Sequence, residues 1–344
     1  MKAREGDLLE TDADLIFDVK GLVQPADRIV AFIRYFPDEK GKRTREGKYF
    51  DKVYSLPKRY TLLKDRFPEY LVYDPVFDET LCEVPVDSVQ EHYRPVEKLQ
   101  ELRHSGGLDT LQSKALRFAE LLKETAGMPW SALGISGSIM VGLHTPESDI
   151  DPVVYGSENC KKVYSALESM FKNEHESVKP YTQQDLKVLF DFRSKDTAIG
   201  FEDFLRTESR KVMQGKFNGT DYFIRFVKDW DEIDENYGDV QYKNIGNARV
   251  EARVVDDSES TFTPCTYKIE SVKSLAGLRI ECLKEIVSFR GRFCEQARRG
   301  EIVVAQGKVE RVTDRRKNEE HYRLLIGGKH SDYIVLKHQF ILKS

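Results

Sequence analysis

The feature that most constrains this chain is a Gly-Ser pair followed, after ten residues, by two aspartates separated by one apolar residue. Gly137 and Ser138 come directly after an apolar stretch, and Asp149 and Asp151 lead into another. Because side chains alternate along a strand, the two aspartates are expected on one face, about 6 to 7 Å apart along the backbone. The stretch predicts a buried strand over 130–135, a turn into a helix near residue 139, and a second strand that begins with two carboxylates.

This arrangement suits the binding of a metal ion and a phosphate group. Two carboxylates on one face can share divalent cations, and Mg²⁺ usually binds one or two carboxylates together with substrate phosphates. The exposed amides of a turn before a helix attract phosphate. Glycine at such a turn also lets a triphosphate approach the main chain. The alternative is a surface loop followed by a solvated strand end, since isolated Asp-x-Asp pairs are common on surfaces.

The motif resembles the nucleotidyltransferase superfamily typified by DNA polymerase beta. Members of that family carry Gly-Ser or Gly-Gly, a short interval, and then Asp-apolar-Asp-apolar. Here Pro152 stands where an apolar strand residue is usual, and because proline lacks an N–H the strand is expected to pair on one side only there. The resemblance covers about the middle third of the chain.

The resemblance implies transfer of a nucleoside monophosphate from an NTP, such as ATP, to an acceptor, with release of pyrophosphate. Asp149 and Asp151 would hold two Mg²⁺ ions, and Gly137 with Ser138 would bind the β- and γ-phosphates. The acceptor stays open among RNA, a protein side chain and a small molecule. One rival interpretation is a decayed transferase that acts as a nucleic-acid-binding module. Another is a protein whose central domain only supports two β-rich modules.

The family also implies a third carboxylate on a later strand, where this sequence departs from the pattern. Phe223 occupies the expected acidic position, so the acid is displaced to Asp221, two residues earlier on the same face. Glu251 is the other candidate. Arg225 and Lys211 are expected to contact the nucleotide phosphates. Lys211 belongs to a basic cluster that could equally be a solvated helix face; its members are Arg206, Arg210, Lys211 and Lys216.

Composition limits the class of protein. The 344 residues have a formal net charge of −4, which argues against a surface built throughout to hold nucleic acid. The five cysteines are scattered without a CxxC pair, so neither a zinc site nor a disulfide framework is indicated. The first residues lack an apolar signal core, and no stretch is long enough to cross a bilayer. A cytoplasmic protein without a membrane partner is expected, and its oligomeric state stays open.

The expected fold class is α+β, with a polymerase beta-like core of mixed sheet and helices between two small β-rich domains. We expect a β-rich accessory domain over 1–104, the nucleotidyltransferase core over 105–238, and a small β-barrel-like domain over 239–344. Residues 94–108 are interpreted as a connection, and a helix is expected over 109–125.

Further helices are expected over 157–171, 182–192 and 200–214. In the first domain, basic residues interleave with aromatics. That mixture suits single-stranded nucleic acid, although a polar hairpin with ordinary aromatic packing is the alternative. The residues are Arg34, Tyr35, Lys42, Arg43, Arg45, Lys48, Tyr49, Lys52, Tyr54, Lys58, Arg59 and Tyr60.

Overall fold

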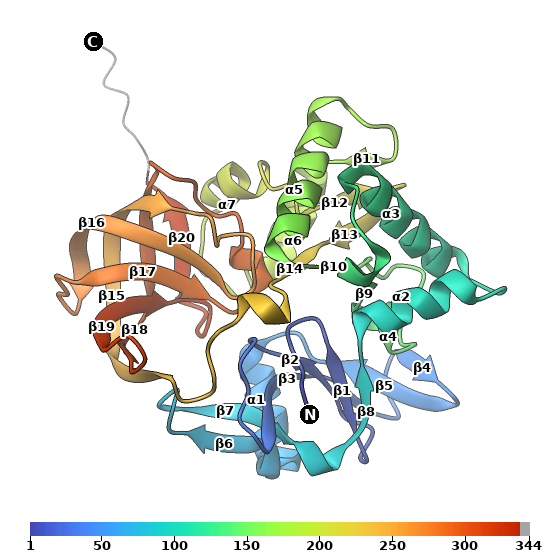
Figure 1. Cartoon of the computed structure of the whole chain (residues 1–344), viewed down its shortest axis with the longest axis horizontal. Helices are drawn as coiled ribbons and strands as arrows, with labels where there is room; N and C mark the ends of the chain where they lie inside the picture. Colours follow the sequence, from blue (N-terminus) through green and yellow to red (C-terminus); the bar gives the residue numbers. More distant parts are fainter. Residues whose placement is uncertain (338–344) are drawn as a thin grey trace. The chain divides into compact units, whose positions relative to one another are not determined.

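The structure is a computed structural model that describes residues 1–337, and it has a mixed α+β fold (Figure 1). The chain divides into two compact units. Unit 1 contains residues 1–73, 80–181 and 212–237, and unit 2 contains residues 74–79, 182–211 and 238–344. The three-domain division expected from the sequence stays a prediction. No helix in the described part of the chain is long and apolar enough to span a membrane.

Unit 1 begins with a curled sheet whose central strands run in the order β4-β5-β3-β2-β1-β8. The hairpin β6–β7 joins this sheet through pairing of β7 with β3. A short helix, α1 (Leu56–Arg66), follows β5 and is capped by the Ser55 side chain. The strands are β1 (Leu8–Thr11), β2 (Ile16–Val19), β3 (Arg28–Pro37), β4 (Arg43–Arg45), β5 (Lys48–Lys52), β6 (Leu71–Asp74), β7 (Glu79–Pro85) and β8 (Val89–Tyr93).

The sheet is apolar on both faces. On β3, Ile29, Ala31 and Ile33 point into one core, while the residues between them are partly exposed, as strand alternation requires. A β-bulge at Arg34 shifts the register with β2, so that Tyr35 turns to the other face. There it belongs to a second cluster that includes Met140 and other residues of the segment between the Gly-Ser pair and the aspartates. This second cluster fixes the sheet against the signature segment.

The signature segment supplies two strands to one small three-stranded sheet of unit 1 and is joined by one bridge to a second. The first has the order β14-β10-β9, with β10 antiparallel to β9 and parallel to β14. The second has the order β11-β12-β13, and an isolated bridge joins Ile150 to Tyr222 of β13. Their strands are β9 (Leu133–Ile135), β10 (Pro152–Tyr155), β14 (Arg225–Val227), β11 (Val178–Lys179), β12 (Gln214–Phe217) and β13 (Thr220–Phe223).

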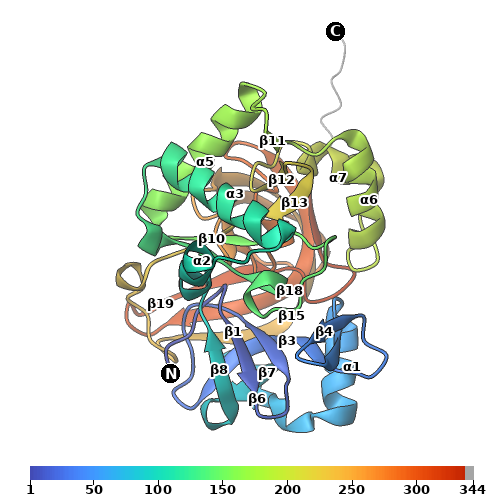
Figure 2. The same cartoon turned by 90° about the vertical axis from the view of Figure 1, so that its right-hand side faces the viewer.

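Helices α3 (Thr110–Ala126) and α5 (Ser157–Lys172) lie side by side in Figure 2 and pack against these sheets. The helix expected over 109–125 is confirmed as α3, because its apolar stripe is spaced for one buried face. Of the two candidate caps, Asp109 and Thr110, the structure has Asp109. The interpretation of 94–108 as a connection was wrong. Helix α2 (Pro95–His104) occupies most of it, starting at a proline and burying Leu99 and Leu102.

Unit 2 contains helices α6 (Gln183–Arg193) and α7 (Phe201–Glu208), which contact each other. The helix expected over 200–214 therefore ends six residues early. After Ser209 the chain turns, and Gln214 already belongs to strand β12 of unit 1. Helical spacing alone did not reveal this strand, because β12 is only four residues long.

The rest of unit 2 is a six-stranded sheet in the order β15-β16-β17-β19-β18-β20. β15 also pairs with β18, so five of the strands form a closed ring of pairings. Closure leaves few strand edges unpaired. The strands are β15 (Val240–Asp256), β16 (Cys265–Gly277), β17 (Leu283–Ser288), β18 (Ile302–Asp314), β19 (Glu319–Leu325) and β20 (Tyr333–Leu336).

Candidate active site

The Gly-Ser turn lies directly against the second aspartate of the signature. β9 ends at Ile135, and α4 (Gly137–Met140) is a single turn that begins with Gly137 at a φ of 66°. A Cβ on Gly137 would lie 1.9 Å from Oδ2 of Asp151, so only glycine fits. The Ser136 N–H donates to the Asp151 carbonyl at 2.9 Å, which joins the turn to the aspartate.

The hydroxyl of Ser138 is the unusual polar group of this turn. Ser138 is buried, and its Oγ has no hydrogen-bond partner. Buried polar atoms are nearly always paired, and leaving one unpaired costs free energy. The turn that contacts Asp151 therefore has a buried hydroxyl that is able to bind a polar ligand.

Asp149 and Asp151 flank the buried Ile150, and both are partly exposed. They lie just before β10, where Ile150 forms a single bridge to β13, and alternation about this extended residue directs both side chains away from the Ile150 side. Burial, together with the charge of Asp149, raises the pKa of Asp151 to about 7. Pro152 pairs with Ile135 of β9, and the register with β14 starts only at Val153, as the missing N–H predicted.

Asp221 lies one strand away from this pair. The Ile150 N–H donates to the Asp221 carbonyl, and the Phe223 N–H donates to the Ile150 carbonyl, at 2.9 and 3.1 Å. This parallel register places Asp221 beside Asp149 and Phe223 beside Asp151. The Asp221 carboxylate, however, forms an ion pair with Lys216 at 2.8 Å and is half exposed. Within residues 1–337, no three His, Cys, Asp or Glu side chains gather into a group that could hold a metal ion.

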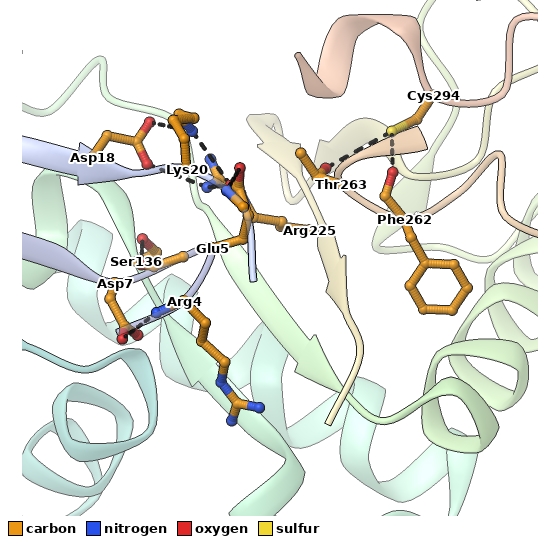
Figure 3. Close-up of polar contacts among 12 residues, drawn as sticks. Arg4, Glu5, Asp7, Asp18, Lys20, Ser136, Arg225, Phe262, Thr263 and Cys294 are labelled. Atoms are coloured by element: carbon orange, nitrogen blue, oxygen red, sulfur yellow. Dashed lines mark hydrogen bonds and ion pairs between the residues drawn. The ribbon is translucent and has the colours of Figure 1, made fainter. Parts of the chain in front are cut away.

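Arg225 is part of a buried ion-pair network. Its guanidinium lies 2.8 Å from Glu5 and 3.3 Å from Asp18, and Lys20 contacts the same two carboxylates (Figure 3). Burial would lower the pKa of Arg225, but the charges of Asp18, Glu5 and Asp151 outweigh it and raise that pKa. Arg225 therefore joins the amino-terminal segment to β14 and also adds positive charge near Asp151.

Two other predicted residues lie in unit 2. Lys211 is buried there, with its ammonium 2.7 Å from Glu208 and donating to the Arg292 carbonyl at 2.8 Å. Glu251, the alternative third acid, lies on β15 and pairs with Lys337 at 2.8 Å. Each has a charged partner in its own unit.

The sequence reasoning did not assign Arg34 and Lys52 to this site. The charges of both interact with those of Asp149 and Asp151. Burial, followed by the charge of Arg34, lowers the pKa of Lys52 to about 8. Both residues belong to the basic and aromatic stretch of the first domain. The composition of that stretch does not indicate which of its basic residues lie near the aspartates.

Two arginines of the same stretch hold the loop between the halves of the signature. Arg43 donates to the Leu143 carbonyl and, at 3.4 Å, to the Ser148 hydroxyl. Arg45 donates to the Val141 carbonyl at 3.1 Å and pairs with a carboxylate of β1. These side chains tie the β4–β5 hairpin to the 141–148 loop.

A search of known proteins found one related in sequence over its full length. It is the uncharacterized protein MJ1086 of Methanocaldococcus jannaschii, which is 33% identical over 348 aligned residues. The alignment covers 98% of this chain and 100% of that protein. The chain belongs to the MJ1086 family. The aligned region therefore spans the sequence of both compact units.

The other comparisons gave no match. No protein-family model matches the chain, and no solved structure matches it significantly.

Proposed function

We propose that the chain is a Mg²⁺-dependent nucleotidyltransferase with a polymerase beta-like core, moving a nucleoside monophosphate from an NTP to an acceptor. The observation that carries the proposal is the contact of the Gly137 main chain with Asp151, with Asp149 beside it and the unpaired Ser138 hydroxyl in the same turn. A loop and a solvated strand end would not require a glycine packed against a carboxylate.

The residues fit the metal. Two carboxylates on one face supply hard oxygen ligands and leave positions for substrate phosphates, which is how Mg²⁺ is usually held. When bound, Mg²⁺ would activate the attacking hydroxyl and neutralise charge on the leaving pyrophosphate.

The protein groups bind and orient the substrates. Gly137 and Ser138 would hold the terminal phosphates of the NTP, with the Ser138 Oγ donating to a phosphate oxygen. The acceptor oxygen then forms a bond to the α-phosphorus while the bond from that phosphorus to the bridging oxygen breaks. The electron pair leaves with pyrophosphate, and the hydroxyl proton passes to water. Positioning of the two substrates is the main contribution of the chain to the rate.

The test is transfer of label from each NTP, in the presence of Mg²⁺, to a pool of cellular RNA. Asp149→Asn and Asp151→Asn should each lower transfer by about a hundredfold or more, because each removes one metal ligand. Glu147→Gln is the matched control, since Glu147 is an exposed acid two residues before Asp149. Full transfer in both aspartate variants would contradict the proposal.

A second candidate function is a nucleic-acid-binding protein whose transferase centre has decayed. The ion pair of Asp221 with Lys216, and the phenylalanine beside Asp151, favour it. Asp221→Asn separates the two candidates. In an active transferase that uses a third acid, it lowers turnover and leaves NTP affinity nearly unchanged. In a decayed protein, no NTP labels any acceptor while RNA still binds.

A further inference from the structure

Arg34 and Lys52 are cations that lack a hydrogen bond or an ion pair in residues 1–337. Neither side chain forms a hydrogen bond or an ion pair with another residue of the described chain, although Lys52 lies over the rings of Tyr35 and Tyr54 at 5.7 and 4.9 Å. Both are partly buried. Buried cations are normally paired, because removing an unpaired charge from water is costly.

The sheet holds these two cations at a fixed place. Tyr35 of β3 is the strand partner of Lys52 of β5, and the Val53 N–H donates to the Arg34 carbonyl at 3.0 Å. Tyr35 is fully buried in the cluster that packs this sheet against the signature segment. Arg34 and Lys52 are therefore carried by rigid strands and do not depend on a loop for their position.

The nearby carboxylates cannot satisfy both cations once a metal is bound. Asp18, which also attracts Arg34, is already paired with Lys20 and Arg225. Asp149 and Asp151 attract both cations, but their charge would be neutralised by Mg²⁺ in the proposed reaction. Arg34 and Lys52 would then be left beside the reaction centre with no anion.

We propose that Arg34 and Lys52 bind a phosphate group of a substrate, so that the amino-terminal sheet is part of the substrate-binding site. This inference rests on the proposed function and adds Arg34 and Lys52 to it as phosphate-binding residues. The planar guanidinium of Arg34 can bind two phosphate oxygens, and the ammonium of Lys52 supplies a compact charge. The phosphate is either the triphosphate of the NTP or a phosphate carried by the acceptor.

The test measures binding of inorganic triphosphate by calorimetry at low salt, with EDTA present so that no metal contributes. Arg34→Met and Lys52→Met should each weaken binding by about tenfold, the usual effect of losing a charge-assisted hydrogen bond. Lys42→Met is the matched control, because Lys42 is an exposed lysine just before β4, and it should bind like the wild type. Asp149→Asn should bind more tightly, since it removes repulsion.

Inorganic phosphate as a second probe identifies the source. If the two variants weaken the binding of triphosphate alone, the NTP supplies the phosphate. If they also weaken the binding of inorganic phosphate, a single phosphate, such as one carried by the acceptor, is sufficient for binding at this site. Lys52→Arg, which keeps the charge, should restore most of the affinity, and thermal unfolding shows whether each variant is folded.

Two results would overturn this inference. One is equal triphosphate affinity in the wild type and in folded Arg34→Met and Lys52→Met. The other is a wild type that binds neither probe, either in EDTA or with Mg²⁺ present to neutralise Asp149 and Asp151. If the protein binds triphosphate through Arg34 and Lys52 but transfers no nucleotide, only the proposed function is contradicted. If the protein is an active transferase and both methionine variants bind triphosphate normally, only this inference is contradicted.

Discussion

Gly137 and Gly142 share one backbone conformation, with φ of 66° at each, but their surroundings differ. A Cβ on Gly137 would collide with the Asp151 carboxylate, whereas one on Gly142 would meet only the flexible side chain of Arg45, at 3.5 Å. From the sequence, Gly137 was explained by the approach of a triphosphate. The structure adds a second reason, which is that the aspartate itself needs the space.

This pair of glycines supplies a matched test. Gly137→Ala and Gly142→Ala should both lose about 1 kcal/mol of stability, because both place a Cβ in the left-handed region. Only Gly137→Ala should displace Asp151, so only this variant should lose transfer activity and Mn²⁺ binding. Thermal unfolding, transfer of label and metal titration measure the three effects. Equal activity of the two variants would mean that the contact with Asp151 is not needed.

At the scale of elements, the β4–β5 hairpin acts on the 141–148 loop. The sequence left its arginines open between a nucleic-acid surface and a polar hairpin. In the structure, Arg43 and Arg45 donate to the carbonyls of Leu143 and Val141. Sequence alone did not show this, because residues about a hundred positions apart meet only when the sheet packs on the signature segment.

We expect Arg43→Met to loosen the loop while leaving the sheet folded. The Leu143 carbonyl and the Ser148 hydroxyl would lose their donor, at a cost of about 1 to 3 kcal/mol for bonds to a charged group. Amide hydrogen exchange over 141–148 should become faster, and transfer should fall. Lys48→Met is the control, because Lys48 lies on the same hairpin, is exposed, and pairs only with Asp14 of the β1–β2 turn. Unchanged exchange in the loop would show that Arg43 does not hold it.

At the scale of the whole molecule, stability in acid should depend on a buried carboxylate of unit 2. Glu310 on β18 is buried, with Arg323 at 2.8 Å and Lys308 at 2.7 Å. Burial would raise the pKa of Glu310, but the two cations outweigh it and hold that pKa below its ordinary value. Its contribution is therefore complete above the unfolded pKa and is lost as pH falls through the lower folded pKa.

Glu310→Gln should lower the free energy of unfolding at pH 7 by about 3 kcal/mol, since Arg323 would be left buried without its carboxylate. The difference between variant and wild type should shrink as pH falls below about 4, where the unfolded wild type takes up the proton. Glu320→Gln is the control, because Glu320 is half exposed and its ion pair with Arg311 is long, at 3.8 Å. Denaturant unfolding across this pH range measures both, and a difference that does not change with pH would exclude the linkage.

The sequence by itself determined the local features: the α+β class, helix α3, and the turn at Gly137 that leads into a short helix. Each depends on spacing or backbone geometry within a few residues. It did not reveal α2, whose short apolar stripe resembles a linker. Only the tertiary structure decided that the charges of Arg34 and Lys52 interact with those of Asp149 and Asp151, and that Asp221 pairs with Lys216. These depend on strand register and sheet packing between distant segments, which local pattern does not encode.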